Sequence, residues 1–353
     1  MNFISFGSVC SGIEAVSVAL NPLGFEADWL AEIEPFPCAV LEHHHPETPN
    51  LGDMTKIAAL IRASKVFAPD VLVGGTPCQA FSVAGMRAGL EDARGQLTIS
   101  FMDLANAIDE NRAEIGKPPA VVWWENVPGV LSDKTNAFGC FLAGLAGESS
   151  ELHPTGGRWA NAGCVFGSQR AIAWRVLDAQ YFGVAQRRRR VFVVASARNG
   201  FDPAQILFEF EGVRRDIAPS RETGQEVAGT ITTSIGRSDN AGSVAGQLIS
   251  AARMVAFGEY VEDGTASTMK ARDYKDATDL IAVTSPASVR RLTPTECERL
   301  QGFPDGYTLI PVKGKPASDA PRYKALGNSM AVPVMRWIGA RIAQHLRGEQ
   351  NAA

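Results

Sequence analysis

Short apolar runs alternate with amphipathic stretches along the first part of the chain. Four runs have the length and composition of buried strands, at 3–9, 27–31, 71–74 and 120–124. Stretches with the period of a helix follow them, at 12–20, 36–42, 55–63 and 97–108. This alternation predicts a mostly parallel sheet with helices on both faces, which is an α/β fold.

The rest of the chain is less regular. Residues 175–182 and 190–197 have the pattern of later strands of the same sheet, whereas 133–167 is Gly-rich and predicts a loop or insertion. Residues 199–288 are rich in Gly, Ser, Thr, Ala and Asp, and predict a second region of short strands and loops. An amphipathic helix at 334–346 starts directly after a proline, and we expect it to return to the sheet domain.

The composition is that of a globular protein. Hydrophobic residues make up 45% of the chain and charged residues 20%. No apolar run approaches the roughly 20 residues that span a membrane, and the first residues lack the layout of a signal peptide. The six cysteines form no CxxC pair, which favours reduced thiols in a cytoplasm and leaves open one reactive cysteine.

The net charge of −4 does not by itself indicate a nucleic-acid-binding protein, but the arginines are unevenly placed. Seven of them lie between Ser168 and Arg198, against the single acid Asp178. Such a stripe on a mildly acidic protein suits an enzyme with one cleft that faces phosphate groups. A solvated run of charges is an alternative of equal weight.

The first strand leads through a glycine turn into a helix, at Cys10-Ser11-Gly12. In an open α/β sheet, ligands bind at the carboxyl ends of the strands, so this turn is a candidate nucleotide site. Glu32 follows about 20 residues later, where an acid can accept hydrogen bonds from ribose hydroxyls. Asp53 lies at a third strand-to-helix junction. Its carboxylate could accept a hydrogen bond from an adenine amino group there, or it could simply cap the helix.

The run at 71–82 carries the strongest chemistry. A buried strand leads into Gly74-Gly75, and Pro77 then stiffens a loop that presents Cys78 at the edge of the sheet. A lone cysteine is more often a small core residue, but one placed on such a loop suits a nucleophile. Glu125 ends another core strand, where an acid is seldom without a role. The arginines at 187–190 precede a further strand.

In this order and spacing, the segments resemble the motifs of the C5-cytosine DNA methyltransferases, over 3–198 and 289–340. The matching segments are Cys10-Ser11-Gly12, Glu32, Asp53, Pro77-Cys78-Gln79 through Ser82, Glu125-Asn126-Val127, Gln186-Arg187-Arg188-Arg189-Arg190, 291–297 with 301–304, and Gly327-Asn328-Ser329. Cys10 stands where the family usually has an aromatic residue that stacks on adenine, and Glu14 and Ala15 stand where it has more glycine. These departures resemble a subgroup from phages and prophages.

The resemblance implies the Rossmann-like fold of methyltransferases that use S-adenosylmethionine, with a smaller target-recognition domain. It places the catalytic and cofactor-binding domain at 1–198 plus 325–353, and target recognition at 199–324 with its variable part at 199–288. The catalytic residues it implies are Cys78, Glu125, Arg188 and Arg190. The cofactor-binding residues are Cys10, Ser11, Gly12, Ile13, Glu32, Ile33, Asp53, Met54, Pro77, Asn328 and Ser329. The DNA-binding residues are Gln79, Ser82, Gln186 and Arg187.

In the reaction that the resemblance implies, the Cys78 thiolate adds to carbon 6 of a cytosine flipped out of duplex DNA, which makes carbon 5 nucleophilic. Glu125 would contact N3 and the exocyclic amine, and Arg190, with Arg188 nearby, would donate to the base oxygen or a phosphate. We expect a monomer that binds double-stranded DNA, no membrane and no metal. A cognate restriction endonuclease is a further candidate partner.

Three other interpretations remain open. A tRNA cytosine methyltransferase would carry the same motifs, although the separate region at 199–288 favours sequence-specific DNA. A catalytically inactive DNA-recognition protein would bind the cofactor, but the intact Cys78, Glu125 and Arg190 argue against it. A metal site at His43-His44-His45 is several times less favoured than a surface cluster, because adjacent side chains on a helix diverge.

Overall fold

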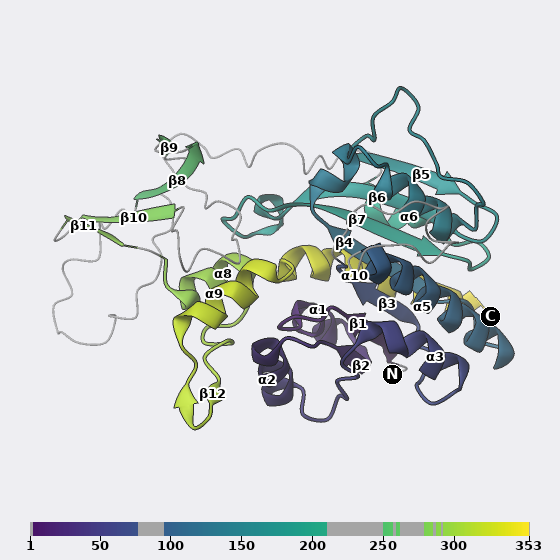
Figure 1. Ribbon diagram of the computed structural model, residues 1–353, viewed down its shortest axis with the longest axis horizontal. Helices are drawn as coiled ribbons and strands as arrows, with labels where there is room; N and C mark the ends of the chain where they lie inside the picture. The colour runs from purple at the N-terminus through teal and green to yellow at the C-terminus, as the bar shows by residue number, and fades with distance from the viewer. Residues whose placement is uncertain are drawn as a thin grey trace. The chain divides into compact units, whose positions relative to one another are not determined.

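The computed structural model describes residues 3–76, 95–209, 250–256, 259–261, 279–284, 287–290 and 292–352. The chain folds into two compact units (Figure 1). The first comprises 1–178, 189–213 and 329–353, and the second comprises 179–188 and 214–328. The chain therefore passes between the units several times, twice within the short stretch from 178 to 189.

The first unit is built on a seven-stranded sheet in the order β2-β1-β3-β4-β7-β6-β5. Its strands are β1 (Ile4–Val9), β2 (Phe25–Ala31), β3 (Val71–Gly74), β4 (Val121–Asn126), β5 (Ala162–Phe166), β6 (Ala171–Asp178) and β7 (Arg189–Ser196). The pairs β1–β2, β1–β3 and β3–β4 are parallel, whereas β4–β7, β7–β6 and β6–β5 are antiparallel. All strands except β5 and β7 therefore point the same way, which confirms the mostly parallel α/β sheet.

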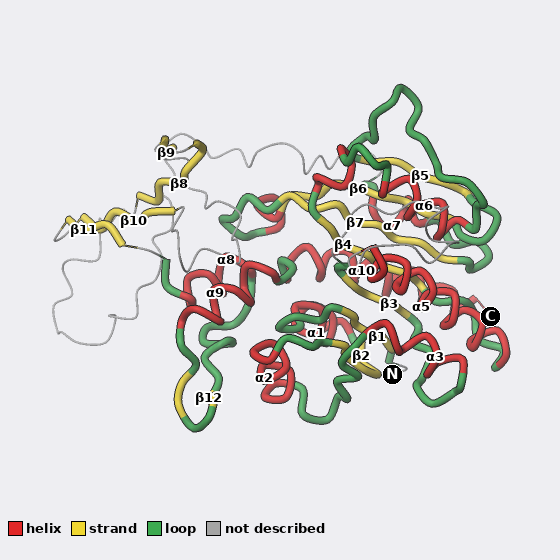
Figure 2. The backbone as a smooth tube through the Cα atoms, viewed as in Figure 1, coloured by secondary structure: helices red, strands yellow, loops and turns green. Residues whose placement is uncertain are grey.

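Helices pack on both faces of this sheet, as Figure 2 shows. One connected group is α3 (Ile57–Arg62), α5 (Gly95–Glu114) and α6 (Ala137–Ala146), and the other is α1 (Ala15–Leu20), α7 (Pro203–Leu207) and α10 (Val332–Ala352). The shorter α2 (Pro35–His44) follows β2. Because side chains alternate along a strand, Val122 and Trp124 enter the core under the first group. Their neighbours Val121 and Trp123 are buried on the opposite face.

The prediction of a loop over 133–167 is wrong in part, because this stretch contains α6 and β5, with irregular structure between them. Nearly every residue of α6 is buried, so the helix has no polar face and its sequence has no helical period. Its glycines lie where the chain packs closely. A Cβ at Gly139 would overlap the Leu152 carbonyl, and one at Gly144 would overlap the Met102 sulfur.

The strand expected at 175–182 is also placed wrongly in part. β6 starts earlier, at Ala171, and its ladder ends where Asp178 pairs with Arg189. The Ala179 amide then bonds to the Arg188 carbonyl at 3.1 Å, and the chain turns into a short 3₁₀ helix, Ala179–Phe182. The strand therefore gives way to a turn at the base of the β6–β7 hairpin.

The C-terminal helix α10 packs on α1 in the first unit, as predicted. A Cβ at Gly339 would overlap the Leu20 side chain, so glycine permits the close approach of the two helices. Arg336 donates to the Val18 carbonyl at 3.4 Å, and Arg341 donates to the Ile206 carbonyl at 2.6 Å. The end of the chain is thereby tied to α1 and to α7.

The second unit contains a four-stranded antiparallel sheet in the order β11-β10-β8-β9. Its strands are β8 (Ser250–Ala256), β9 (Glu259–Val261), β10 (Asp279–Thr284) and β11 (Ala287–Arg290), followed by α8 (Pro294–Gln301), the hairpin β12 (Pro311–Val312) and β13 (Lys315–Pro316), and α9 (Asp319–Asn328). A capping box of Thr293 and Glu296 starts α8. The buried Glu298 pairs with Arg322 at 3.2 Å, joining α8 to α9.

These units differ from the predicted domain boundaries at three places. Residues 179–188 and 325–328 group with the second unit, and the start of the predicted variable region, including α7, groups with the first. The division into a catalytic and a recognition domain is a statement about function, and it stays a prediction. Over the described part of the chain, no helix is long and apolar enough to cross a membrane.

Candidate active site

A strained turn follows β1 and leads into α1. Cys10, Gly12 and Glu14 all have a left-handed backbone, with φ of 50°, 56° and 60°. Ser11 fixes the base of the turn to β2, because its amide donates to the Ala31 carbonyl at 3.1 Å and its Oγ accepts from the Ala31 amide at 3.0 Å. A Cβ at Gly12 would meet nothing within 4 Å, so the turn is open there.

Two residues of this turn are buried and do not face a ligand. Ile13, expected to bind the cofactor, has a fully buried side chain, which leaves only its backbone for that role. Glu14 is also fully buried, and its carboxyl accepts hydrogen bonds from the Ser17 amide (3.0 Å), Ser17 Oγ (3.1 Å) and Ser8 Oγ (3.1 Å). Burial raises the pKa of Glu14 to about 7 although these bonds oppose the shift.

Glu32 connects the end of β2 to the same turn. Its Oε2 accepts from the Gly12 amide at 2.7 Å, and its Oε1 accepts from the amides of Ile33 and Glu34 at 2.8 Å each. A carboxylate offers about four acceptor sites, so a further donor can be accommodated. Beside it, the Ile33 side chain is 72% exposed, which is unusual for a large apolar residue.

Asn50 is a part of this site that the sequence interpretation missed. Its Oδ1 accepts from the Glu32 amide at 2.9 Å and from the Gly52 amide at 3.1 Å, while its Nδ2 donates to the Glu32 carbonyl at 3.1 Å. It therefore fixes the backbone on either side of the predicted ribose acid. The signal in the sequence was an Asn two residues before a Gly, which is typical of a side chain that bonds to its own turn.

Asp53 and Met54 follow on the next connection. Asp53 accepts from the Thr55 amide at 3.0 Å and from Thr55 Oγ1 at 2.8 Å, so it caps a 3₁₀ turn (Met54–Lys56), and the hydroxyl bond lowers its pKa. Met54 is buried, and its sulfur lies 3.6 Å from the Cys10 sulfur. The structure thus brings Cys10, Gly12, Glu32 and Met54 together.

The residues present at this edge fit a nucleoside cofactor. The Glu32 carboxylate offers acceptors for hydroxyl groups, the turn at Gly12 is open, and Ile33 exposes an apolar surface of the kind that packs on a base. Cys10 supplies a sulfur in place of an aromatic ring. These groups lie at the carboxyl ends of neighbouring parallel strands, where α/β sheets bind nucleotides.

A buried ion pair lies at the end of β4. The Arg190 Nε is 3.1 Å from Glu125 Oε1, and both side chains are nearly nine-tenths buried. Arg190 comes from β7, which is antiparallel to β4, so the two residues are diagonal neighbours across the strands. Arg190 also donates to the Arg189 carbonyl at 2.8 Å. The structure therefore brings together two of the predicted catalytic residues.

The same carboxyl lies against the end of β3. A Cβ at Gly75 would come within 3.2 Å of Glu125 Oε2 and within 3.0 Å of Met330, so a side chain here would crowd both. Thr76 is held from β4, since its carbonyl accepts from Asn126 at 2.7 Å and its hydroxyl accepts from the Trp124 ring nitrogen at 2.9 Å. Pro77, Cys78, Gln79 and Ser82 lie outside the described residues, and the loop that carries them starts at this anchored position.

The side chains of 186–190 alternate between the interior and the surface. Gln186 and Arg188 are buried, whereas Arg187 and Arg189 are exposed. The contacts to DNA that were expected of Gln186 and Arg187 stay predictions. The Arg188 guanidinium donates to the Gly327 carbonyl at 3.1 Å within the second unit, and its predicted catalytic role stays a prediction.

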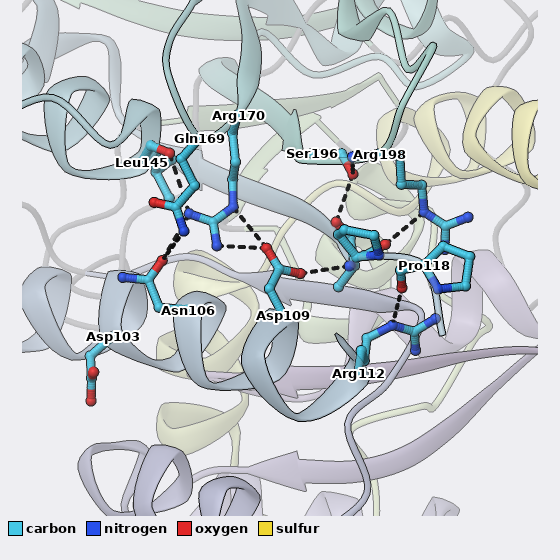
Figure 3. Close-up of polar contacts among 12 residues, drawn as sticks. Asp103, Asn106, Asp109, Arg112, Pro118, Leu145, Gln169, Arg170, Ser196 and Arg198 are labelled. Carbon is cyan, nitrogen blue, oxygen red and sulfur yellow. Dashed lines mark hydrogen bonds and ion pairs between the residues drawn. The ribbon is translucent and has the colours of Figure 1, made fainter. Parts of the chain in front are cut away.

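Three other arginines of the basic stripe serve the scaffold, and Figure 3 shows Arg170 and Arg198 among them. Arg170 is fully buried and pairs with Asp109 at 2.7 Å, and the other oxygen of Asp109 accepts from the Ala120 amide. Arg198 donates to the Pro119 carbonyl at 2.7 Å, and Arg175 donates to that of Leu207 at 2.8 Å. The expectation of a stripe that faces phosphate is therefore wrong for these residues. Sequence alone does not show which arginines have backbone partners.

The last predicted cofactor motif joins α9 to α10. Asn328 is exposed at the end of α9, and Ser329 is buried with its hydroxyl donating to the Met330 carbonyl at 3.4 Å. Met330 in turn lies next to Gly75 in the first unit. The motif thus leads the chain back to the end of β3.

The five cysteines that the structure describes form no disulfide, and the pKa values of three of them are raised. Burial, with the charge of Glu32, raises the pKa of Cys10 to about 12. Burial also raises the pKa of Cys38 and of Cys164. Cys140 and Cys297 are buried. A thiol with a raised pKa is largely protonated near neutral pH and therefore unreactive.

Known proteins resemble this chain along almost its full length. A DNA N-6-adenine-methyltransferase of Escherichia phage P1 is 46% identical over 471 aligned positions, which cover 98% of this chain and 62% of that protein. The chain thus spans less than two thirds of the length of this relative. The relative comes from a phage, which agrees with the predicted phage-like subgroup. The Type II methyltransferase M.HpaII of Haemophilus parainfluenzae is 28% identical, covering 97% of this chain and 90% of its own.

The crystal structure of the S. pombe Dnmt2 methyltransferase has the same fold, with a TM-score of 0.62 at 15% identity over 98% of this chain and 99% of that one. The family described as C-5 cytosine-specific DNA methylase matches residues 4–344. Its methyl donor is S-adenosylmethionine, which agrees with the cofactor predicted from the sequence. The chain belongs to the C-5 cytosine-specific DNA methylase family.

Proposed function

We propose that the chain is a DNA (cytosine-5-)-methyltransferase that acts on a cytosine flipped out of duplex DNA, through a covalent adduct on Cys78. The observation that carries this proposal is the Glu125–Arg190 pair, packed against the Gly75–Thr76 root of the loop that bears Cys78. The acid, the cation and the residues from which the cysteine loop starts then lie at the same end of the sheet as the turn at Cys10–Gly12.

At the cofactor end of the site, Glu32 would hold the ribose hydroxyls of S-adenosylmethionine and Ile33 would pack on its base, with Asp53 near the adenine. Asn50 and Ser11 act indirectly, because they fix the backbone that carries Glu32 and the turn. The cofactor supplies an electrophilic methyl group when bound. Asn328 and Ser329, at the return to the first unit, remain assigned to the same pocket.

At the reacting end, the Cys78 sulfur forms a bond to carbon 6 of cytosine, and the electron pair of the 5,6 double bond moves so that carbon 5 becomes nucleophilic. Carbon 5 is the atom that the methyl group joins. Its proton then leaves, the double bond forms again, and the sulfur departs as thiolate. The Arg190 cation favours the thiolate before and after this cycle.

Glu125 is suited to stabilise the added base. Its carboxyl is held by Arg190 on one oxygen and faces Gly75 with the other, so its orientation is fixed before the base arrives. Such preorganised groups stabilise charge where it develops in the transition state. Flipping a base costs a few kcal/mol, and a pocket that already holds its polar groups in place offsets part of this cost.

We assign recognition of duplex DNA to 199–324 and the chemistry to 1–198 plus 325–353. Arg187, exposed beside the buried Arg188, would contact phosphate. A cognate restriction endonuclease is a candidate partner because relatives of this chain have Type II methyltransferase names. We also expect the enzyme to act as a monomer.

Methylation of adenine at N6 is the second candidate, because the phage P1 relative carries that name. More than a third of that protein lies outside the aligned region. The adenine methylation in its name can therefore belong to a part of it that this chain does not match. Incubating the chain with duplex DNA and labelled S-adenosylmethionine, followed by mass analysis of the nucleosides, separates the two. We expect 5-methylcytosine, and none from Cys78→Ala. N6-methyladenine without 5-methylcytosine would overturn the proposal.

A further inference from the structure

We infer that Glu14 is a positioning residue that sets the shape of residues 10–13, which we call the cofactor turn. Its carboxyl joins the two elements on either side of this turn. Oε1 accepts from the amide and the hydroxyl of Ser17 in α1, at 3.0 and 3.1 Å, and Oε2 accepts from the Ser8 hydroxyl in β1 at 3.1 Å. This role rests on the proposed function, because the same turn holds Glu32, the acid that we assign to the cofactor.

The backbone of Glu14 has a conformation that residues with a side chain seldom adopt. Its φ and ψ are 60° and 56°, in the left-handed region, where the Cβ comes too close to the following carbonyl oxygen. Such a conformation persists only where the surrounding structure stabilises it. The three hydrogen bonds of the carboxyl supply this stabilisation, because they hold the side chain between the start of α1 and the end of β1.

Hydrogen bonds inside the turn add to those of the carboxyl. The Glu14 amide donates to the Ser11 carbonyl at 2.9 Å, and Ser11 Oγ donates to the Ser8 carbonyl at 3.0 Å. Ser8 is therefore tied to Glu14 directly, through the carboxyl, and also through Ser11 in the middle of the stretch. Fixing both ends and the middle of so short a stretch leaves the cofactor turn few other backbone shapes.

Gly12 connects the shape of the turn to the cofactor site. The Gly12 amide donates to Glu32 Oε2 at 2.7 Å, which is a charge-assisted hydrogen bond that orients the carboxylate. Glu14 itself is fully buried, so its side chain does not reach a ligand. If the turn lost its shape, Glu32 would lose this donor, and cofactor binding would then have to order the carboxylate as well. Glu14 therefore lowers the Kd for S-adenosylmethionine without touching it.

The start of α1 is the other feature that these bonds serve, because Glu14 is also the N-cap of that helix. Asp202 offers a matched comparison in the same unit, since it caps the short helix α7 by accepting from the Ala204 amide at 3.0 Å. Removing either cap should lower the stability of the fold. A cap that acts only on its helix would leave cofactor binding unchanged in both cases.

The test measures the binding of S-adenosylmethionine by calorimetry at pH 8, where Glu14, with a pKa of about 7, is largely ionised. Glu14→Gly removes the side chain but adopts the left-handed backbone freely, so it separates the effect of the hydrogen bonds from that of the backbone. Its Kd should rise about tenfold or more. Glu14→Gln, which keeps an acceptor for Ser17 and offers a donor to Ser8, should stay within about threefold of wild type.

Thermal unfolding and kinetics separate positioning from a general loss of stability. Glu14→Gly and Asp202→Ala should both melt at a lower temperature than wild type, but only Glu14→Gly should lose affinity for the cofactor. At saturating S-adenosylmethionine, the single-turnover rate of Glu14→Gly should fall far less than its affinity does. An unchanged Kd in Glu14→Gly, or an equal loss of affinity in Asp202→Ala, would overturn the inference.

Ser8→Ala decides if Glu14→Gly does not fold. This variant removes the bond between the carboxyl and β1 and leaves the bonds to Ser17 at the start of α1 in place. It should raise the Kd for S-adenosylmethionine about threefold or more. A Kd equal to that of wild type would show that the bridge to β1 does not set the shape of the turn.

Failure of the proposed function would look different. Calorimetry needs neither DNA nor methyl transfer, so it decides on Glu14 even if the wild-type chain forms no 5-methylcytosine. If wild type methylates cytosine and Glu14→Gly binds S-adenosylmethionine as tightly as wild type, the positioning role of Glu14 alone is refuted.

Discussion

Arg190 of β7 and Glu125 of β4 are diagonal neighbours across the two strands, with the guanidinium Nε 3.1 Å from the carboxyl Oε1. The pair is nearly buried, and the second carboxyl oxygen lies against Gly75 at the start of the loop that carries Cys78. Charge partners in a buried site lose much of their solvation, so each depends on the other for its orientation. This dependence predicts how their substitutions combine.

Glu125→Gln and Arg190→Met should each lower the single-turnover rate of methylation by about 10²- to 10³-fold, the usual loss for a group that stabilises a transition state. The double variant should lose little more than either single variant, because the two act as one unit. The matched control is Arg62→Met, which breaks an exposed ion pair with Asp103. Additive losses in the double variant, or a loss in Arg62→Met, would contradict the account.

Glu32→Ala should weaken the binding of S-adenosylmethionine roughly ten- to hundredfold in calorimetry, as expected when a charge-assisted hydrogen bond is removed. The loss has two sources, since Glu32 would hold the ribose and also holds the Gly12 amide. Glu34→Ala, at the exposed residue two positions on, is the control. If Glu32→Ala bound S-adenosylmethionine as tightly as wild type, the assignment of Glu32 to the cofactor site would be wrong.

Glu14 should make stability depend on pH in an unusual direction. Its pKa is raised to about 7 in the folded chain from 4.5, chiefly by burial, so between these values the folded state binds more protons than the unfolded state. Stability therefore falls as the pH rises from about 4.5 to about 7. Glu14→Gln removes this titration. Urea unfolding at pH 5 and pH 8 should show that wild type loses more stability than Glu14→Gln, and equal losses would contradict the assignment.

Much of the fold followed from the sequence because it depends on local patterns. The strands β1 to β4 are short apolar runs between helical periods, and Glu32 and Glu125 follow such runs directly. The helix α6 could not be predicted, since a helix buried all round has no period. Asn126 was assigned no positioning role, because its partner Thr76 lies 50 residues away in the sequence.

The recognition assignment predicts that specificity can be moved. Replacing 199–288 with the equivalent region of a relative, such as M.HpaII, should shift methylation to the sequence that the relative modifies. A region of loops and short strands can read base edges in the major groove, where each base pair differs. Sequencing of modified positions checks this, with the unswapped chain as the control. Methylation that stays at the original site after the swap would count against the division.

The central claim concerns Cys78, and the five described cysteines serve as its controls. Cys10 lies near the cofactor turn, yet its pKa of about 12 keeps it protonated near neutral pH. Cys78→Ser should abolish turnover, because a serine hydroxyl is far less ionised than a thiol. Cys10→Ser should keep turnover at saturating cofactor. If a cysteine other than Cys78 proved essential for methyl transfer, the assignment of Cys78 as the nucleophile would be wrong.

The most direct measurement uses DNA with 5-fluorocytosine at the target position. If the Cys78 sulfur adds to carbon 6, release requires loss of the substituent on carbon 5, and fluorine cannot leave as a cation. Denaturing electrophoresis and peptide mapping should therefore find DNA covalently joined to Cys78, only when S-adenosylmethionine is present, and none joined in Cys78→Ser. Adduct mapped to another residue, or full turnover by Cys78→Ser, would contradict the account.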